Sequence, residues 1–321
     1  MNQNKMKITS FDAEETGCFG DVLSHAPEHR PLSVGMLGLG YFEYWRMYPA
    51  LERQVSEDLD KAAGLLAGAL PECKVIYPGM VDTLNRAETA GSAFRDAQID
   101  VLVVIAGTYL PDFITMHAIN QIQTHPEVIL FSTQTGNDVN PDDNYIATMR
   151  NSALIAMTQL SGSFRKMKLD YHTVVGEIGD PSAYRRIAGL TAARSAAKRL
   201  KKSTYGLVGH VFRGMYDLEF DRSKVKGFLG PEVMTIQAEH LVEQWRAVPD
   251  AETAVESERL FRRFQVKNIE LDDVKRSVRL GLAMRGLYRK FNLDGLCFLG
   301  QHYIEKMTGA PARMGASMLM E

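Results

Sequence analysis

Two short segments in the first half of the chain are hydrophobic at every position, which is typical of strands that are buried on both faces. They are residues 101–105 and 128–131. Between them, residues 112–123 place hydrophobic side chains at helical spacing: Phe113, Met116 and Ile119. The pattern predicts a strand, a crossover helix and a second strand that is parallel to the first.

The same alternation extends in both directions along the chain. Further strands are predicted at residues 33–39, 74–77 and 171–175. Helices are predicted at residues 43–70, 83–97, 144–167 and 181–202. Asp82 is the expected N-cap of the second of these helices, and Asp180 followed by Pro181 is the expected start of the last. Five strands therefore alternate with helices between residues 33 and 202.

A second unit with the same alternation follows. Its strands are predicted at residues 205–208, 233–237 and 294–299, and its helices at 238–264, 271–291 and from 316 onward. The fold class is therefore α/β, with two consecutive Rossmann-like or flavodoxin-like domains, each a parallel sheet with helices on both faces. The expected domains are residues 31–201 and 202–321, preceded by a polar arm at 1–30. Because the chain stops inside the last predicted helix, we expect a polypeptide that is cut short.

Composition narrows the class of protein. The chain has 321 residues, 45% of them hydrophobic and 24% charged, with a net charge of -2. Without a basic excess, nucleic acid is not an expected partner, and no hydrophobic run is long enough to suggest a membrane span. The N-terminus lacks the hydrophobic core of a signal peptide, and Cys18, Cys73 and Cys297 form no CxxC pair. These features predict a cytoplasmic protein without a disulfide framework or a zinc site.

Small polar residues follow two of the predicted buried strands, at residues 107–109 and 132–138. Open α/β sheets bind ligands outside the carboxyl ends of their strands. These two loops are therefore the first candidates for contact with a small ligand rich in hydroxyl groups. The alternative is that they are ordinary turns with capping residues.

Familiar catalytic and cofactor motifs are not present. Residues 35–40 read GMLGLG, which has the spacing GxxGxG and not the GxGxxG of a dinucleotide site, and no acidic residue follows the second strand. An NAD-dependent oxidoreductase is therefore a minor alternative, and no P-loop, GxSxG or HExxH motif occurs.

Two histidines and one acidic cluster remain as candidates for chemistry. His210 and His302 each follow a predicted strand, where either a site or an ordinary hydrogen-bonded loop residue is possible. Asp217, Glu219 and Asp221 lie close together and carry the oxygen ligands that a hard divalent cation prefers. A solvated acidic strand or loop, balanced by the adjacent Arg222 and Lys224, explains the cluster better.

Five stretches in a collinear order resemble the L-arabinose isomerase family, within the L-arabinose/L-fucose isomerase superfamily. They are residues 128–137, 172–186, 207–217, 227–237 and 274–299. The resemblance implies an aldose–ketose isomerase that acts on a pentose or 6-deoxyhexose. It also implies a three-domain subunit in a hexameric or trimer-based homo-oligomer. In that family Mn²⁺ polarises the sugar oxygens, and two glutamates move the proton through an enediol.

The resemblance assigns residues to the sugar site one at a time. Thr133 and Gln134 match a Thr-Gln pair near the sugar, and Met215 matches a methionine presented to the neighbouring subunit's site. His302 stands where arabinose isomerases place an aromatic residue beside the sugar. These four are the predicted substrate-binding residues. Gly40, Phe42 and Glu43 depart from the family pattern, which places L-arabinose itself in doubt as the substrate.

The metal ligands of the family have no counterpart here. The first metal-binding glutamate lies in a Gly-Glu-Gly-Asp stretch that would come after Glu321. We therefore predict no catalytic residue and no metal ligand in this chain, no bound Mn²⁺, and no activity of the chain alone. The alternative class of function is a non-catalytic sugar-binding or assembly module of an isomerase-like complex.

Overall fold

The computed structural model describes residues 31–136 and 145–320, so the predicted arm at residues 1–30 lies outside the described residues. The chain divides into two compact units between Ala196 and Ala197. The helix α8 (Pro181–Lys202) crosses this boundary, and the predicted domain boundary lies at the end of that helix. Each unit is described by itself.

The first unit is a parallel sheet of five strands with the order β2-β1-β3-β4-β5. In register, β1 pairs with β3 from Val34↔Val101 to Leu39↔Ala106. This order is that of flavodoxin-like doubly wound sheets, one of the two fold types that were predicted. Besides α8, the elements are β1 (Ser33–Leu39), α2 (Phe42–Met47), α3 (Pro49–Ala69), β2 (Lys74–Ile76), α4 (Leu84–Asp96), β3 (Val101–Ala106), α5 (Asp112–Asn120), β4 (Glu127–Gln134), α6 (Tyr145–Arg150), α7 (Ala153–Met167) and β5 (His172–Glu177).

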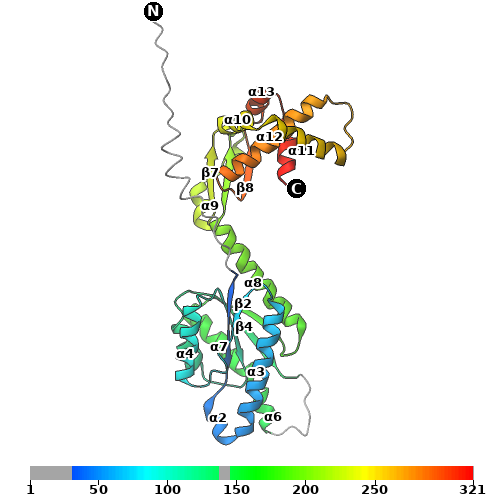
Figure 1. Cartoon of the computed structure of the whole chain (residues 1–321). Coiled ribbons are helices and arrows are strands. Elements are labelled where there is room, and N and C mark those ends of the chain that lie inside the picture. Colours follow the sequence, from blue (N-terminus) through cyan, green and yellow to red (C-terminus); the bar gives the residue numbers. More distant parts are fainter. Residues whose placement is uncertain (1–30, 137–144, 321) are drawn as a thin grey trace, which may run out of the picture. The chain divides into compact units, whose positions relative to one another are not determined.

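Helices cover both faces of this sheet, and each face has its own hydrophobic cluster. Figure 1 shows α3 and α8 on one side of the strands and α4 and α7 on the other. Neighbouring residues of β4 alternate between the two clusters: Phe131 packs in the cluster with Leu59 of α3, and Leu130 in the cluster with Phe164 of α7. The unbroken hydrophobic pattern of the central strands follows from burial on both sides.

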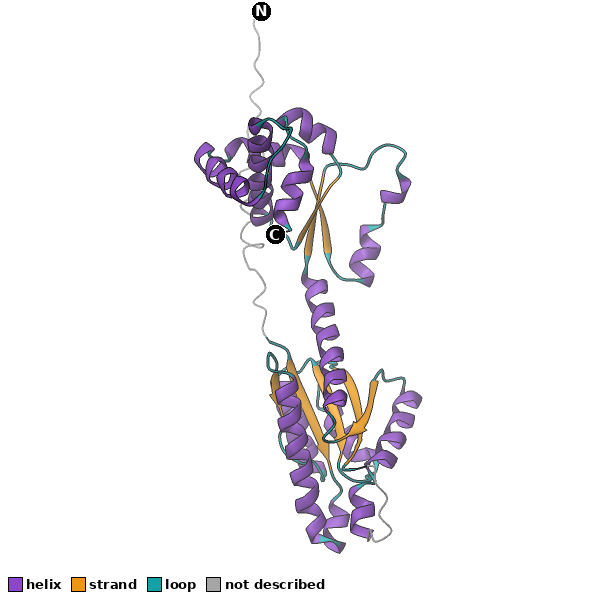
Figure 2. Ribbon diagram, turned by 90° about the vertical axis from the view of Figure 1, so that its right-hand side faces the viewer, coloured by secondary structure: helices purple, strands orange, loops and turns teal. Residues whose placement is uncertain are grey.

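The second unit holds a parallel sheet of three strands, β7-β6-β8, flanked by helices (Figure 2). Its core joins Val208 and Ile236 of the strands to Met284 and Leu287 of a long helix. The elements are β6 (Thr204–Val208), η1 (Tyr216–Leu218), α9 (Arg222–Phe228), β7 (Glu232–Ile236), α10 (Ala238–Ala247), α11 (Asp250–Arg263), α12 (Leu271–Lys290), β8 (Gly295–Phe298), α13 (Gln301–Thr308) and α14 (Ala312–Leu319). The predicted fold class is confirmed.

One predicted helix start is confirmed and one is wrong. Asp180 accepts hydrogen bonds from the backbone N and the Oγ of Ser182 at the start of α8, and these bonds lower the pKa of the Asp180 carboxyl. At α4, however, Thr83 is the N-cap, and its Oγ1 accepts from Arg86 N at 3.4 Å. Asp82 is instead buried, where its Oδ2 accepts from Trp45 Nε1 at 2.8 Å.

Three predicted helices are broken in the structure. The helix predicted at 43–70 breaks at Tyr48, because the following Pro49 disfavours helical backbone in the residue before it. The helix predicted at 238–264 breaks in the same way before Pro249. The helix predicted at 144–167 breaks at Asn151 and Ser152, and the one expected from residue 316 begins already at Ala312.

Among the described helices, none is long and apolar enough to cross a membrane.

Candidate functional site

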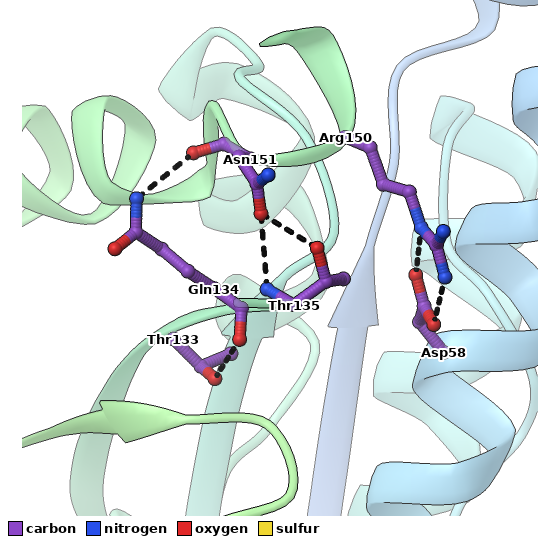
Figure 3. Close-up of polar contacts among 6 residues, drawn as sticks. All are labelled: Asp58, Thr133, Gln134, Thr135, Arg150 and Asn151. Atoms are coloured by element: carbon purple, nitrogen blue, oxygen red, sulfur yellow. Dashed lines mark hydrogen bonds and ion pairs between the residues drawn. The ribbon is translucent and has the colours of Figure 1, made fainter. Parts of the chain in front are cut away.

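The described residues that follow β4 form a small polar surface at the carboxyl edge of the first sheet (Figure 3). Asn151, in the break between α6 and α7, accepts two hydrogen bonds at its Oδ1, from Thr135 N at 3.1 Å and from Thr135 Oγ1 at 2.6 Å. Gln134 Nε2 donates to the backbone oxygen of Asn151 at 3.5 Å. All three residues are half-buried. We call Gln134, Thr135 and Asn151 the polar shelf.

Neighbouring contacts hold Asn151 in place from both sides. Before it, Arg150 donates to both carboxylate oxygens of Asp58 through Nε and Nη2, each at 2.6 Å, which ties α6 to α3. The hydrogen bonds that Arg150 donates to Asp58 raise the pKa of the Arg150 guanidinium. After it, Ser152 Oγ donates to Met149 O and accepts from Tyr109 N at 2.7 Å. The loop after β3 and the loop after β4 are therefore joined through this break, and the shelf is fixed before any ligand binds.

The shelf leaves polar groups for a ligand. The Nδ2 group of Asn151 and the Oε1 atom of Gln134 take part in none of the contacts drawn in Figure 3. Beneath the edge, the side-chain oxygens of Thr108 and Ser132 are buried and have no hydrogen-bond partner among the described residues. The edge is thus rich in neutral donors and acceptors, which suits a ligand with hydroxyl groups and no net charge.

The four predicted substrate-binding residues are divided between the two units. Thr133 and Gln134 end β4 in the first unit, but only Gln134 belongs to the polar shelf. Thr133 is 3% exposed, and its Oγ1 donates to Gln134 O at 3.4 Å. Met215 and His302 lie in the second unit and are both exposed.

In the second unit, the loops that follow β6 and β8 meet. A Cβ atom on Gly209 would lie 2.7 Å from the backbone N of Gly300, so the two loops touch at a point where only glycine fits. Beyond this point, the rings of Phe212 and His302 are in edge-to-face contact, with 5.7 Å between the ring centroids. The structure therefore brings the His210 loop and the His302 helix to one edge of the second sheet.

In the acidic cluster of the second unit, one of the three carboxylates has a structural role. Asp221 is the N-cap of α9 and accepts from Lys224 N at 3.1 Å, whereas Asp217 lies in η1. Where a strand or a loop was expected, the structure has η1 and the loop that leads to α9, and all three carboxylates are exposed. Within residues 31–136 and 145–320, no three side chains of the ligating types gather to hold a metal ion. The described residues do not fit the Mn²⁺ site that the resemblance implies.

Three residues that build or support the polar shelf are not predicted from the sequence: Asn151, Arg150 and Asp58. The predicted helix at 144–167 ran through the first two and left no reason to place them at a site. The signal that was available is the Asn-Ser pair at 151–152, since both side chains compete with helical hydrogen bonding. Asn137 and Asp138, which belong to the predicted loop after β4, lie outside the described residues.

Comparison of the chain with models of protein families, and with curated proteins, gave no match.

Proposed function

We propose that the polar shelf binds a sugar, a pentose or a 6-deoxyhexose, and that the chain is part of an aldose–ketose isomerase-type protein. The observation that carries this proposal is the shelf itself. It places three neutral polar side chains at the carboxyl edge of a doubly wound sheet, which is where such folds bind ligands. The collinear resemblance to the arabinose and fucose isomerases supports the choice of a sugar.

The chemistry of the shelf agrees with a sugar ligand in two respects. An amide group and a hydroxyl group each offer both donors and acceptors, as sugar hydroxyls do. The shelf is also ordered in advance by the Asp58–Arg150 pair and by Ser152, so little conformational entropy is lost when a ligand binds. Since the described residues do not fit a metal site, the proposal gives the shelf only the task of binding and orienting sugar hydroxyls.

The proposal also includes the surroundings in which the protein acts. We place it in the cytoplasm, as a homo-oligomer without nucleic-acid or membrane partners. The free thiols of Cys73 and Cys297 agree with a reducing compartment.

Titration of the full chain with L-arabinose, L-fucose and their ketose products tests the binding site. We expect saturable binding that is about 2- to 10-fold weaker in Asn151→Ala and in Gln134→Ala, the loss that one or two hydrogen bonds produce. Thr124→Ala is the matched control. It removes a hydroxyl that donates to Ile99 O before β4, at the opposite edge of the sheet, and should leave affinity unchanged.

Two results would decide against the proposal. One is the absence of saturable binding of any of these sugars, and the other is equal affinity in the shelf variants and the parent. A parallel assay of aldose–ketose conversion with added Mn²⁺ separates an enzyme from a sugar-binding module. Turnover supports the isomerase, and binding without turnover supports the non-catalytic module.

A further inference from the structure

A cleft lies at the carboxyl edge of the first sheet, apart from the polar shelf. Its volume is about 630 Å³, and it lies between the first turns of α3, the first turns of α4 and the loop at residues 78–81. Its polar lining comes from five side chains: Glu52, Arg53, Ser56, Arg86 and Thr89. None of the shelf residues lines it. The volume falls within the range of pockets that hold small molecules.

Two arginines line this cleft, one from each helix, against a single lining carboxylate, that of Glu52. The Arg53 side chain is 78% exposed, and its partner Glu57 lies 3.8 Å away on the same helix, at a spacing where exposed ion pairs are weak. Its guanidinium is therefore available to a stronger acceptor. A phosphate or carboxylate group can take two parallel hydrogen bonds from such a group.

Arg86 is held in position by a buried carboxylate. Its Nη1 donates to Asp82 Oδ2 at 3.1 Å, and the same oxygen accepts from Trp45 Nε1 at 2.8 Å. Asp82 is almost completely buried, while the Arg86 side chain is 54% exposed. One edge of the guanidinium is thus anchored, and the group still lines the cleft. An anchored arginine loses less rotamer entropy when it binds an anion.

The backbone adds to the attraction for an anion. Both α3 and α4 begin at the cleft, and the amino ends of helices carry partial positive charge. The acidic Glu52 and the hydroxyls of Ser56 and Thr89 complete the lining. Their oxygens can accept hydrogen bonds from hydroxyl groups that extend away from the anionic end of a ligand, while the Thr89 hydroxyl itself donates to Asn85 O at 2.9 Å.

We propose that this cleft binds a small phosphorylated polyol, such as a sugar phosphate, at a site separate from the one that takes the neutral sugar. The phosphate lies between Arg53 and Arg86, and the hydroxyl groups face Glu52, Ser56 and Thr89. The site stands independently of the proposed function, because no residue is common to the cleft and the polar shelf.

Calorimetric titration of the full chain with ribose 5-phosphate, ribose and inorganic phosphate tests this assignment. We expect ribose 5-phosphate to bind more tightly than either of the others, and added salt to weaken it. Arg53→Gln should weaken binding of ribose 5-phosphate about 10-fold or more, the loss expected of a charged hydrogen-bond donor. Arg95→Gln is the control, since Arg95 is an arginine in the last turn of α4, at the end of that helix away from the cleft.

Further variants keep the test independent of folding. Arg86→Gln does not serve this purpose, because it removes a charged partner of the buried Asp82 and the resulting loss of stability can obscure its effect on binding. Thr89→Glu adds a negative charge in the cleft at an exposed position and leaves both arginines in place, and it should abolish binding. The proposal is overturned if ribose binds as tightly as ribose 5-phosphate, if no probe binds, or if Arg53→Gln and Arg95→Gln bind equally well.

Discussion

At the scale of single residues, the position of Asn151 depends on the residue before it. Arg150 fixes the end of α6 through two bonds to Asp58, and Asn151 then reaches Thr135. The Asp58 side chain is 14% exposed and that of Arg150 35% exposed, so water screens the pair only in part. A pair of this kind contributes more than an ion pair on an open surface.

We expect Asp58→Asn to lower the free energy of unfolding by about 1–2 kcal/mol, less than for a fully buried pair because Arg150 keeps access to water. The variant should also weaken sugar binding at the polar shelf. Urea unfolding and sugar titration measure the two effects. Glu57→Gln, on the same helix but 67% exposed, is the control and should change stability by less than about 0.5 kcal/mol. Unchanged stability and binding in Asp58→Asn would show that the pair does not support the shelf.

At the scale of elements, the sequence predicts strands better than helix ends. Seven consecutive residues of β1 and six of β3 are buried, so no charged side chain interrupts either segment, and both strands are predicted to within one residue. The helix breaks depend instead on single residues such as Pro49 and Ser152, which act through local backbone geometry and side-chain competition. The short η1 and α9 were missed because they bury no residue and so leave no periodic pattern.

The candidate site shows the same limit. The loop at residues 132–138 is predicted because the carboxyl edge of a parallel sheet can be located from the strand pattern, whereas Gln134 itself is assigned to a sugar site only by the resemblance. Asp58 and Arg150 could not be paired from the sequence, since 92 residues separate them and their contact depends on how α3 and α6 pack. Thr133, predicted beside Gln134, is buried because it lies one residue further inside a sheet that helices cover on both faces.

Packing of α14 on α12 gives a prediction at the scale of elements. A Cβ atom on Gly315 would lie 3.0 Å from both Gly281 N and Met284 Sδ, so the two helices approach closely through glycine. We expect Gly315→Ala to lower the free energy of unfolding by about 1–3 kcal/mol, the usual effect of overpacking.

Gly227→Ala in α9 is the matched control for this packing effect. A Cβ atom there would meet nothing within 4 Å, and alanine should stabilise that helix by about 0.5–1 kcal/mol. Thermal unfolding followed by circular dichroism compares the two variants. Equal stability of Gly315→Ala and the parent protein would contradict the close approach of α12 and α14.

At the scale of the whole molecule, each unit has a hydrophobic core of its own. The first unit has one cluster on each face of its sheet, and the second has its main cluster around β6, β7 and α12. The helix α8 crosses the boundary between the units, yet its buried residues all precede Ala196: Ala183, Tyr184, Ile187 and Thr191. Its buried side chains therefore belong to the first unit, and among the described residues each hydrophobic cluster is made of side chains from one unit.

Separate cores predict separate unfolding, and the two tryptophans of the chain allow each unit to be followed alone. Trp45 lies in the first unit and Trp245 in the second, so Trp245→Phe and Trp45→Phe each leave a single fluorescent reporter.

Leu59 and Leu287 are both completely buried, one in each core. We expect Leu59→Ala to lower the stability reported by Trp45 by about 2–5 kcal/mol, and Leu287→Ala to do the same for Trp245. Because neither side chain contributes to the other core, each substitution should leave the other reporter's urea midpoint unchanged. Equal shifts of both midpoints by either substitution would show that the units unfold as one cooperative body.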